Sequence, residues 1–194
     1  MLDDLNKVIP RWEWRYFTVD PVELLPVFRG IEPVAEQTTQ HTYLISQNPA
    51  LNMKFRDGHL DVKYLVETSS AGFEKWKPVF KAEFPLDGAK LDQLLQIVGM
   101  DVSSDLSLGS LEDLSEQLEL ATLEIHKERK KYLVDDVSCE HAEIKAHDKI
   151  IFTMAIEDPD PEKISSARES LGVRVSENVN YPTALKKFYK SIIG

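Results

Sequence analysis

Hydrophobic and polar residues alternate in several stretches of this chain, and the alternation predicts β-strands. Residues 11–17 read RWEWRYF, which places alternate aromatic residues on one face of an extended chain and Arg11, Glu13 and Arg15 on the other. Residues 40–46 form a second candidate strand. In residues 75–84 we expect Trp76, Phe80, Ala82 and Phe84 on one face, with Lys77, Lys81 and Glu83 on the other.

The clearest local signal is a hairpin over residues 52–66. Asp57-Gly58 is a favoured two-residue turn, and it pairs Arg56 with His59. Because directly paired residues share a face, one face carries the polar residues Asn52, Lys54, Arg56, His59, Asp61 and Lys63. The other face carries Met53, Phe55, Leu60, Val62 and Tyr64.

Residues 123–134, LEIHKERKKYLV, are open to two interpretations. The helix formers within 110–131 are compatible with one continuous helix. The run Tyr132-Leu133-Val134, and the strand-like chain after it, favour a strand that begins near Ala121. In a strand, Lys127, Arg129 and Lys131 form one row, and three neighbouring cations repel each other unless an anion lies between them.

Residues 137–146 and 150–157 predict a second hairpin. A three-residue loop over 147–149 places Ala142, Ile144, Ile150, Phe152, Met154 and Ile156 on one apolar face. The opposite face then carries His141, Glu143, Lys145, Thr153, Ala155 and Glu157. A two-residue loop would pair Glu143 with Phe152 and mix the faces, so we expect the three-residue loop.

Capping signals predict helices between and after the strands. They begin at Asp20-Pro21, Asp87, Ser110 (with Asp113), Asp160-Pro161 and Pro182, and the second is expected to end at Gly99. A polar loop is expected over 101–109. The pattern as a whole predicts an α+β fold in which residues 1–194 form one domain, an eight-stranded antiparallel β-barrel with peripheral helices. Because ionisable side chains are costly to bury dry, we expect a solvated, charge-lined interior.

Composition narrows the possible partners. The 194 residues carry a formal net charge of -10, which argues against binding to duplex nucleic acid or an anionic membrane. A small anion remains possible if the basic residues gather inside. Cys139 is the only cysteine, and we find no signal peptide or membrane span at the N-terminus, so we expect a cytoplasmic protein. The oligomeric state stays open.

The order of these features resembles the CYTH family, also called triphosphate tunnel metalloenzymes. This family includes class IV adenylyl cyclases, thiamine triphosphatases and inorganic triphosphatases. Residues 11–15 stand in the place of its E-x-E-x-K motif, with Glu13 and Arg15 matching and Arg11 replacing the first glutamate. Lys54, Arg56 and Lys63 match the basic hairpin of the family, and Lys127-Glu128-Arg129 matches its K-x-R strand. Glu143 matches its acidic strand position. Ala155-Ile156-Glu157 matches its closing E-x-E motif, with one glutamate lost.

The resemblance implies a tunnel that binds a triphosphate or another polyphosphate. The implied substrate-binding residues are Arg15, Lys54, Arg56, Lys63, Lys81, Lys127, Arg129 and Lys131, of which Lys54, Arg56, Lys127 and Arg129 would also be catalytic. Mg²⁺ or Mn²⁺ would be held by Glu13, Glu143 and Glu157, although salt bridges to Arg15 are an alternative role for Glu13 and Glu157.

Three functions are therefore open: a metal-dependent triphosphate hydrolase or cyclase, a noncatalytic anion binder that has lost metal ligands, and an interaction module without a ligand. In the last case the basic residues would lie on a solvated barrel exterior.

Overall fold

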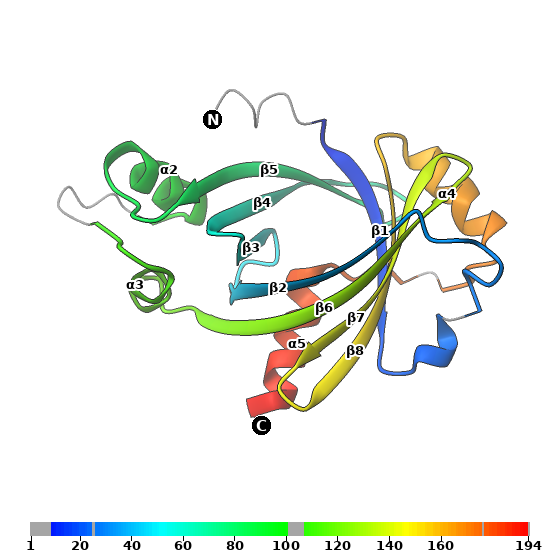
Figure 1. The fold of residues 1–194 in the computed structure, drawn as a ribbon. Coiled ribbons are helices and arrows are strands. Elements are labelled where there is room, and N and C mark those ends of the chain that lie inside the picture. Colours follow the sequence, from blue (N-terminus) through cyan, green and yellow to red (C-terminus); the bar gives the residue numbers. More distant parts are fainter. Residues whose placement is uncertain (1–8, 25, 101–106, 176, 194) are drawn as a thin grey trace.

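The computed structural model describes residues 9–24, 26–100, 107–175 and 177–193. Within these residues, eight antiparallel strands close into a barrel in the order β1-β5-β4-β3-β2-β6-β7-β8 (Figure 1). The strands are β1 (Arg11–Thr18), β2 (Ala35–Ile45), β3 (Leu51–Arg56), β4 (His59–Thr68), β5 (Glu74–Glu83), β6 (Ala121–Val134), β7 (Val137–Ala146) and β8 (Lys149–Asp158). The predicted α+β fold with an eight-stranded antiparallel barrel is confirmed.

The helices are η1 (Pro21–Glu23), α2 (Gly88–Val98), α3 (Leu111–Gln117), α4 (Pro161–Ser170) and α5 (Tyr181–Ile193). Helices α2, α3 and α4 lie outside the strand cylinder, whereas α5 packs against apolar residues of its inner face (Figure 1). Asp20, Ser110 and Asp160 accept hydrogen bonds at helix starts, as predicted, and Gly99 ends α2 with a φ of 80°. Residues 101–106 of the predicted polar loop are outside the described residues. None of the described helices combines the length and apolar composition needed to span a bilayer.

The strand interpretation of residues 123–134 is confirmed. A capping box at Ser110 and Asp113 starts α3, and the helix ends at Gln117. Glu119 then has a φ of 51°, which breaks the helical path, and β6 begins two residues later at Ala121. Lys127, Arg129 and Lys131 consequently stand in one row on the inner face of the barrel.

The hairpin of β3 and β4 has the predicted register, with Arg56 opposite His59 and Lys54 opposite Asp61. Its apolar face points outward and is covered by α2 and α3. The resulting core contains Met53, Leu60, Val62, Phe80, Ala82, Leu91, Leu94, Leu95 and Leu114. The polar face of the same hairpin is left to line the interior of the barrel.

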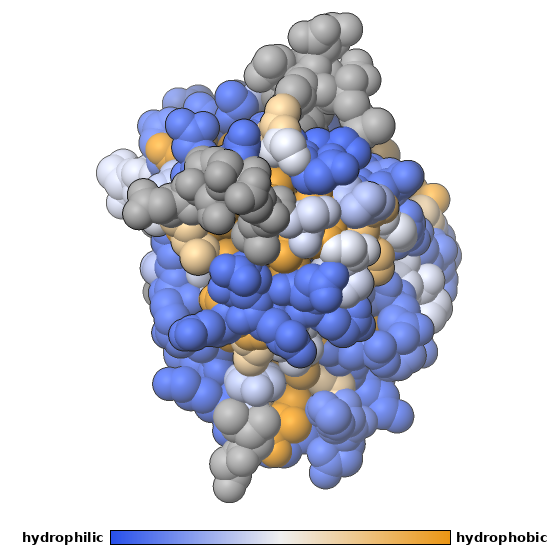
Figure 2. All heavy atoms as spheres, turned by 90° about the vertical axis from the view of Figure 1, so that its left-hand side faces the viewer, coloured by the Kyte–Doolittle hydropathy of each residue, from blue (hydrophilic) through white to orange (hydrophobic). Residues whose placement is uncertain are grey.

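A second core covers the outer faces of β1, β7 and β8. Trp12, Trp14, Cys139, Met154 and Ile156 pack there against Ile164 and Ala167 of α4. Because helices cover apolar strand faces on two sides of the barrel, the charged faces turn inward. The visible face around α2 and α3 is mostly hydrophilic (Figure 2).

The predicted register of β7 and β8 is wrong. Their loop has two residues, with Ala146 opposite Lys149, and Glu143 does face Phe152. The reason is that this hairpin buries apolar residues on both faces. Met154 and Ile156 pack outward under α4, whereas Ile144 and Ile151 point inward and contact α5.

The predicted common face of β5 is confirmed for Phe80, Ala82 and Phe84 and is wrong for Trp76. Val62 of β4 pairs with Phe80, but the next residue, Lys63, pairs with Pro78, so the register shifts at this point. The shift turns Trp76 toward the interior, although Phe80 faces the outer core.

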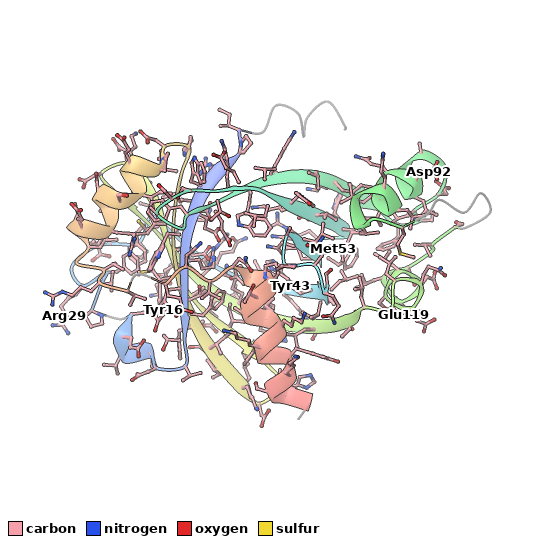
Figure 3. The ribbon with its side chains drawn as sticks, turned by 180° about the vertical axis from the view of Figure 1, so that it is seen from behind. Tyr16, Arg29, Tyr43, Met53, Asp92 and Glu119 are labelled. Atoms are coloured by element: carbon pink, nitrogen blue, oxygen red, sulfur yellow. The ribbon has the colours of Figure 1, made fainter. Side chains whose placement is uncertain are left out.

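Helix α5 fills one side of the interior. Leu185 and Phe188 pack against Tyr43, Ile45, Leu123, Ile125, Ile144 and Ile151, which point inward from β2, β6, β7 and β8. Figure 3, seen from behind, shows Tyr43 beside α5. The tyrosine rings of Tyr43 and Tyr181 stack with centroids 5.5 Å apart and form the boundary between this apolar cluster and the charged part of the interior.

We expect Leu185→Ala to lower the free energy of unfolding by about 2–5 kcal/mol. The leucine side chain is fully buried between α5 and the inner face of the barrel, and the shorter alanine would leave a cavity there. Urea denaturation measures the change. Lys187→Ala, on the exposed side of the same helix, is the control and should change stability by less than about 0.5 kcal/mol. Equal effects of the two substitutions would contradict this packing.

Candidate anion-binding cavity

A cavity of about 240 Å³ lies inside the barrel and is lined by charged side chains from its strands. Among the described residues, its basic lining groups are Arg11, Arg15, Lys54, Arg56, Lys63, Lys127, Arg129 and Lys131. Its acidic lining groups are Glu13, Asp61, Glu140 and Glu157. The lining thus has a formal excess of four positive charges in a chain whose net charge is -10. The basic residues are concentrated inside, as the sequence suggested.

Glu140 is the centre of an ion-pair network at one wall. Its carboxylate accepts hydrogen bonds from Lys127 Nζ at 2.7 Å, Arg15 Nη1 at 3.2 Å and Arg129 Nη1 at 3.4 Å. Burial alone would raise the pKa of Glu140, but Lys127 and Arg15 outweigh it and hold the pKa well below its usual range. Glu140 is therefore a permanent anion that fixes three cations in place.

Glu13 and Glu157 complete this network from neighbouring strands, where they are directly paired. Arg15 Nε donates to Glu13 Oε1 at 2.8 Å, and Arg15 Nη2 lies 3.8 Å from Glu157 Oε1. Burial opposes ionisation of Glu13, yet Arg15 leaves its pKa lowered. For Glu157, burial and the charge of Glu13 together raise the pKa.

Other cations of the cavity have no such partner. Within the described residues, no ion pair involves Lys54, Lys63 or Lys131. Asp61, which faces Lys54 across the hairpin, bonds instead to Arg56 Nε at 2.8 Å. Burial and the charges of Arg56 and Lys63 lower the pKa of Lys54 to about 7. Among the described residues no carboxylate is bonded to this amine, and an anion in the cavity would stabilise its charged form.

His41 lines the cavity, although the sequence analysis did not predict it as a site residue. Its side chain is buried, and Nδ1 has no hydrogen-bond partner within the described residues. Burial and the nearby charges of Lys54 and Arg56 lower the pKa of His41 to about 4, so its ring is neutral at neutral pH. A neutral imidazole can offer one hydrogen bond to a ligand without adding charge.

Most of the residues predicted for the site do line the cavity, and two do not. The lining includes Glu13, Arg15, Lys54, Arg56, Lys63, Lys127, Arg129, Lys131 and Glu157. Lys81 is exposed and lies outside the lining, and Glu143 faces the outer side of β7 near His141 and Lys130. The expected metal-binding position of Glu143 is therefore not in the cavity. Glu140, three residues earlier, takes the inward position.

The error over Glu143 follows from the choice of the inner face of β7. The family resemblance assigned Glu143 to the acidic strand position, and the face shared by His141, Glu143 and Lys145 was expected to point inward, but it points outward. Ser138, Glu140 and Ala142 alternate inward along β7, and they lie opposite Glu157, Ala155 and Thr153 of β8. The alternation was present in the sequence. It was hidden because Ile144 and Ile151, further along the same inner face, are apolar.

The cavity does not fit the divalent cation that the family resemblance implies. The three carboxylates that meet there are already bound to cationic side chains, with the Arg15 guanidinium in the middle. No group of three or more His, Cys, Asp or Glu in the described part of the chain is arranged to hold a metal ion. For Glu13 and Glu157 the structure thus shows the salt bridges to Arg15.

Comparisons with known proteins concern the fold. No protein-family model and no curated protein sequence matches the chain. Among solved structures, the chain is similar to HpAC1 from Hippeastrum, a proposed adenylyl cyclase described as having a dominant triphosphatase activity. The identity is 13%, the match covers 91% of this chain and 95% of that chain, and the TM-score is 0.55. The predicted tunnel fold is confirmed.

Two archaeal proteins show a weaker likeness. PH1012 from Pyrococcus horikoshii OT3 is 15% identical over 89% of this chain and 97% of that chain, with a TM-score of 0.49. A conserved hypothetical protein from Pyrococcus furiosus is 16% identical over 89% of this chain and 98% of that chain, with a TM-score of 0.48.

We expect Glu140→Gln to lower the free energy of unfolding by about 3 kcal/mol, because it leaves buried cations without their shared counter-ion. Urea denaturation at neutral pH measures the effect. Glu143→Gln is the matched control on the outer face of the same strand, and it should change stability by less than about 0.5 kcal/mol. A larger loss for Glu143→Gln than for Glu140→Gln would contradict the register.

Proposed function

We propose that this chain binds a compact polyanion of the triphosphate class inside the barrel, without requiring a divalent cation. The excess of positive charge in the lining of the cavity carries the proposal, because it contrasts with the strongly negative charge of the whole chain. The ligand is either an inorganic polyphosphate or the triphosphate group of a larger molecule.

The arrangement of the cations supports recognition of several phosphate groups at once. Arg56 and Arg129 are each held by a carboxylate, which fixes their direction before a ligand arrives. Lys54, Lys63 and Lys131, which form no ion pair within the described residues, can turn their amines toward phosphate oxygens. The repulsion among these cations is relieved when the anion binds, and this difference favours the bound state.

Hydrolysis or cyclisation of the bound triphosphate is a second candidate function. It is favoured by Glu157, whose raised pKa and loose 3.8 Å contact with Arg15 leave a carboxyl group able to exchange a proton beside the ligand. The triphosphatase activity described for HpAC1, a protein of the same fold, is in keeping with this role.

We expect isothermal titration calorimetry with inorganic triphosphate, in the presence of EDTA, to show binding that Lys54→Met weakens by about 10- to 100-fold. The loss corresponds to one charge-assisted contact. Lys81→Met is the control, because this lysine lies on the same barrel but outside the cavity lining, and it should retain the affinity.

The same proteins, assayed separately in EDTA and in Mg²⁺, decide between the remaining functions. Phosphate release from triphosphate, lost in Glu157→Gln, would establish turnover, whereas binding without release supports a noncatalytic binder. No heat of binding in EDTA would overturn the proposed function. Binding that appears only with Mg²⁺ would then favour the metal-dependent hydrolase or cyclase, and no binding in either condition would favour an interaction module.

The affinity for triphosphate should fall as the pH rises above about 7. Below this pH Lys54 is protonated before the ligand arrives. Above it, binding must take up a proton, so the affinity decreases by up to about tenfold per pH unit. The arginine of Lys54→Arg stays charged over this pH range, so the variant should lack this decrease of affinity with pH. Titrations on both sides of pH 7 compare the two proteins, and identical slopes would contradict the role of Lys54.

A further inference from the structure

Three carboxylates from three different strands converge on one guanidinium group. Arg15 donates to Glu13 through Nε at 2.8 Å and through Nη2 at 3.2 Å, and to Glu140 through Nη1 at 3.2 Å. Glu157 lies 3.8 Å from Nη2, and the hydroxyl oxygen of Thr153 lies 3.3 Å from Nη1. The guanidinium nitrogens of Arg15 are thus all engaged by protein groups, which leaves this arginine little capacity to bind a ligand.

The strand register explains how one side chain reaches across three strands. Arg15 of β1 is paired with Ala155 of β8, and Ala155 is in turn paired with Glu140 of β7. Because Ala155 has only a methyl group, the arginine side chain can pass over β8 to Glu140. A long side chain at position 155 would occupy this path.

The surroundings suit a guanidinium better than a hydrated metal ion. The Arg15 guanidinium carbon lies 4.5 Å from the centroid of the Tyr181 ring, and the Ala155 side chain is fully buried beside it. A guanidinium is weakly hydrated and stacks on aromatic rings. Mg²⁺ usually keeps several bound waters, which these apolar groups cannot hydrogen-bond.

The charges of the network are already balanced. Arg15, Lys127 and Arg129 provide three positive charges to the three glutamates, and Arg15 is only 3% exposed. A divalent cation placed among the glutamates would meet Arg15 at close range. It could bind there only by displacing a buried and fully bonded side chain.

We infer that the Arg15 guanidinium takes the place of a divalent cation among the three glutamates of the cavity, and that these glutamates can move together around a metal ion only when this side chain is removed. The inference deepens the proposed function, because it concerns the same cavity and explains why anion binding needs no metal. Its test uses metal alone, so the two can fail separately.

The experiment is a titration of Mn²⁺ followed by electron paramagnetic resonance, in which bound Mn²⁺ is lost from the six-line signal of the free ion. We expect the unaltered protein to leave this signal unchanged. Arg15→Met, which keeps an unbranched side chain without its charge, should bind Mn²⁺ and reduce the signal, with an affinity at least about tenfold above the detection limit of the titration. Glu157→Gln added to Arg15→Met should abolish the new binding.

Arg56→Met is the matched control, because Arg56 lines the same cavity but bonds to a single carboxylate. It should gain no Mn²⁺ binding, which separates a metal site from a general loss of positive charge. Circular dichroism reports whether each variant is folded. If Arg15→Met does not fold, Arg15→Gln is used in its place.

Two results would overturn the inference. One is Mn²⁺ binding by the unaltered protein that Glu157→Gln removes, since the glutamates would then hold metal with Arg15 present. The other is a folded Arg15→Met or Arg15→Gln protein that binds no Mn²⁺. If Arg15→Met gains Mn²⁺ binding but the unaltered protein does not bind triphosphate, the proposed function is overturned and this inference stands.

Discussion

The packing of apolar strand faces against external helices is the constraint on which this structure depends. Two of the three hydrophobic cores among the described residues lie between the outside of the barrel and its helices, with Met53 and Leu60 under α2 and α3, and Trp14 and Met154 near α4. Because strand residues alternate between faces, burial of these apolar residues outside directs the charged residues inside. The charged interior is thus a consequence of where the helices pack.

A charged interior is stable only where its groups are paired or solvated. The structure uses both solutions. Around Glu140 the charges are matched and tightly bonded, whereas Lys54 and Lys63 face open space in the cavity. The paired part forms one wall of the cavity, and the rest of its described lining carries more cations than carboxylates. Charges that stabilise the fold through ion pairs are thus separate from those that only line the cavity.

The sequence predicted those elements whose local signals agree with one another. The β3–β4 hairpin is an example, because the Asp57-Gly58 turn and the split of apolar and polar residues specify the same register. The β7–β8 hairpin could not be predicted in this way, since α4 and α5 bury apolar residues on its opposite faces. Glu140 was missed for that reason. The pairing of Arg15 with Glu140 joins residues 125 positions apart, which no local pattern reveals.

The closure of the barrel has a consequence for how the chain acquires its fold. The seam joins β1 to β8, the first and last strands, and Tyr181 of α5 lies beneath the cavity. A chain that has been synthesised only as far as β7 lacks β8 and α5. The apolar residues that these elements cover in the folded protein are then still exposed to solvent. Long-range pairing of this kind is slow to form. The arrival of β8 and α5 therefore completes the cavity and at the same time covers apolar surface that would otherwise favour aggregation of the nascent chain.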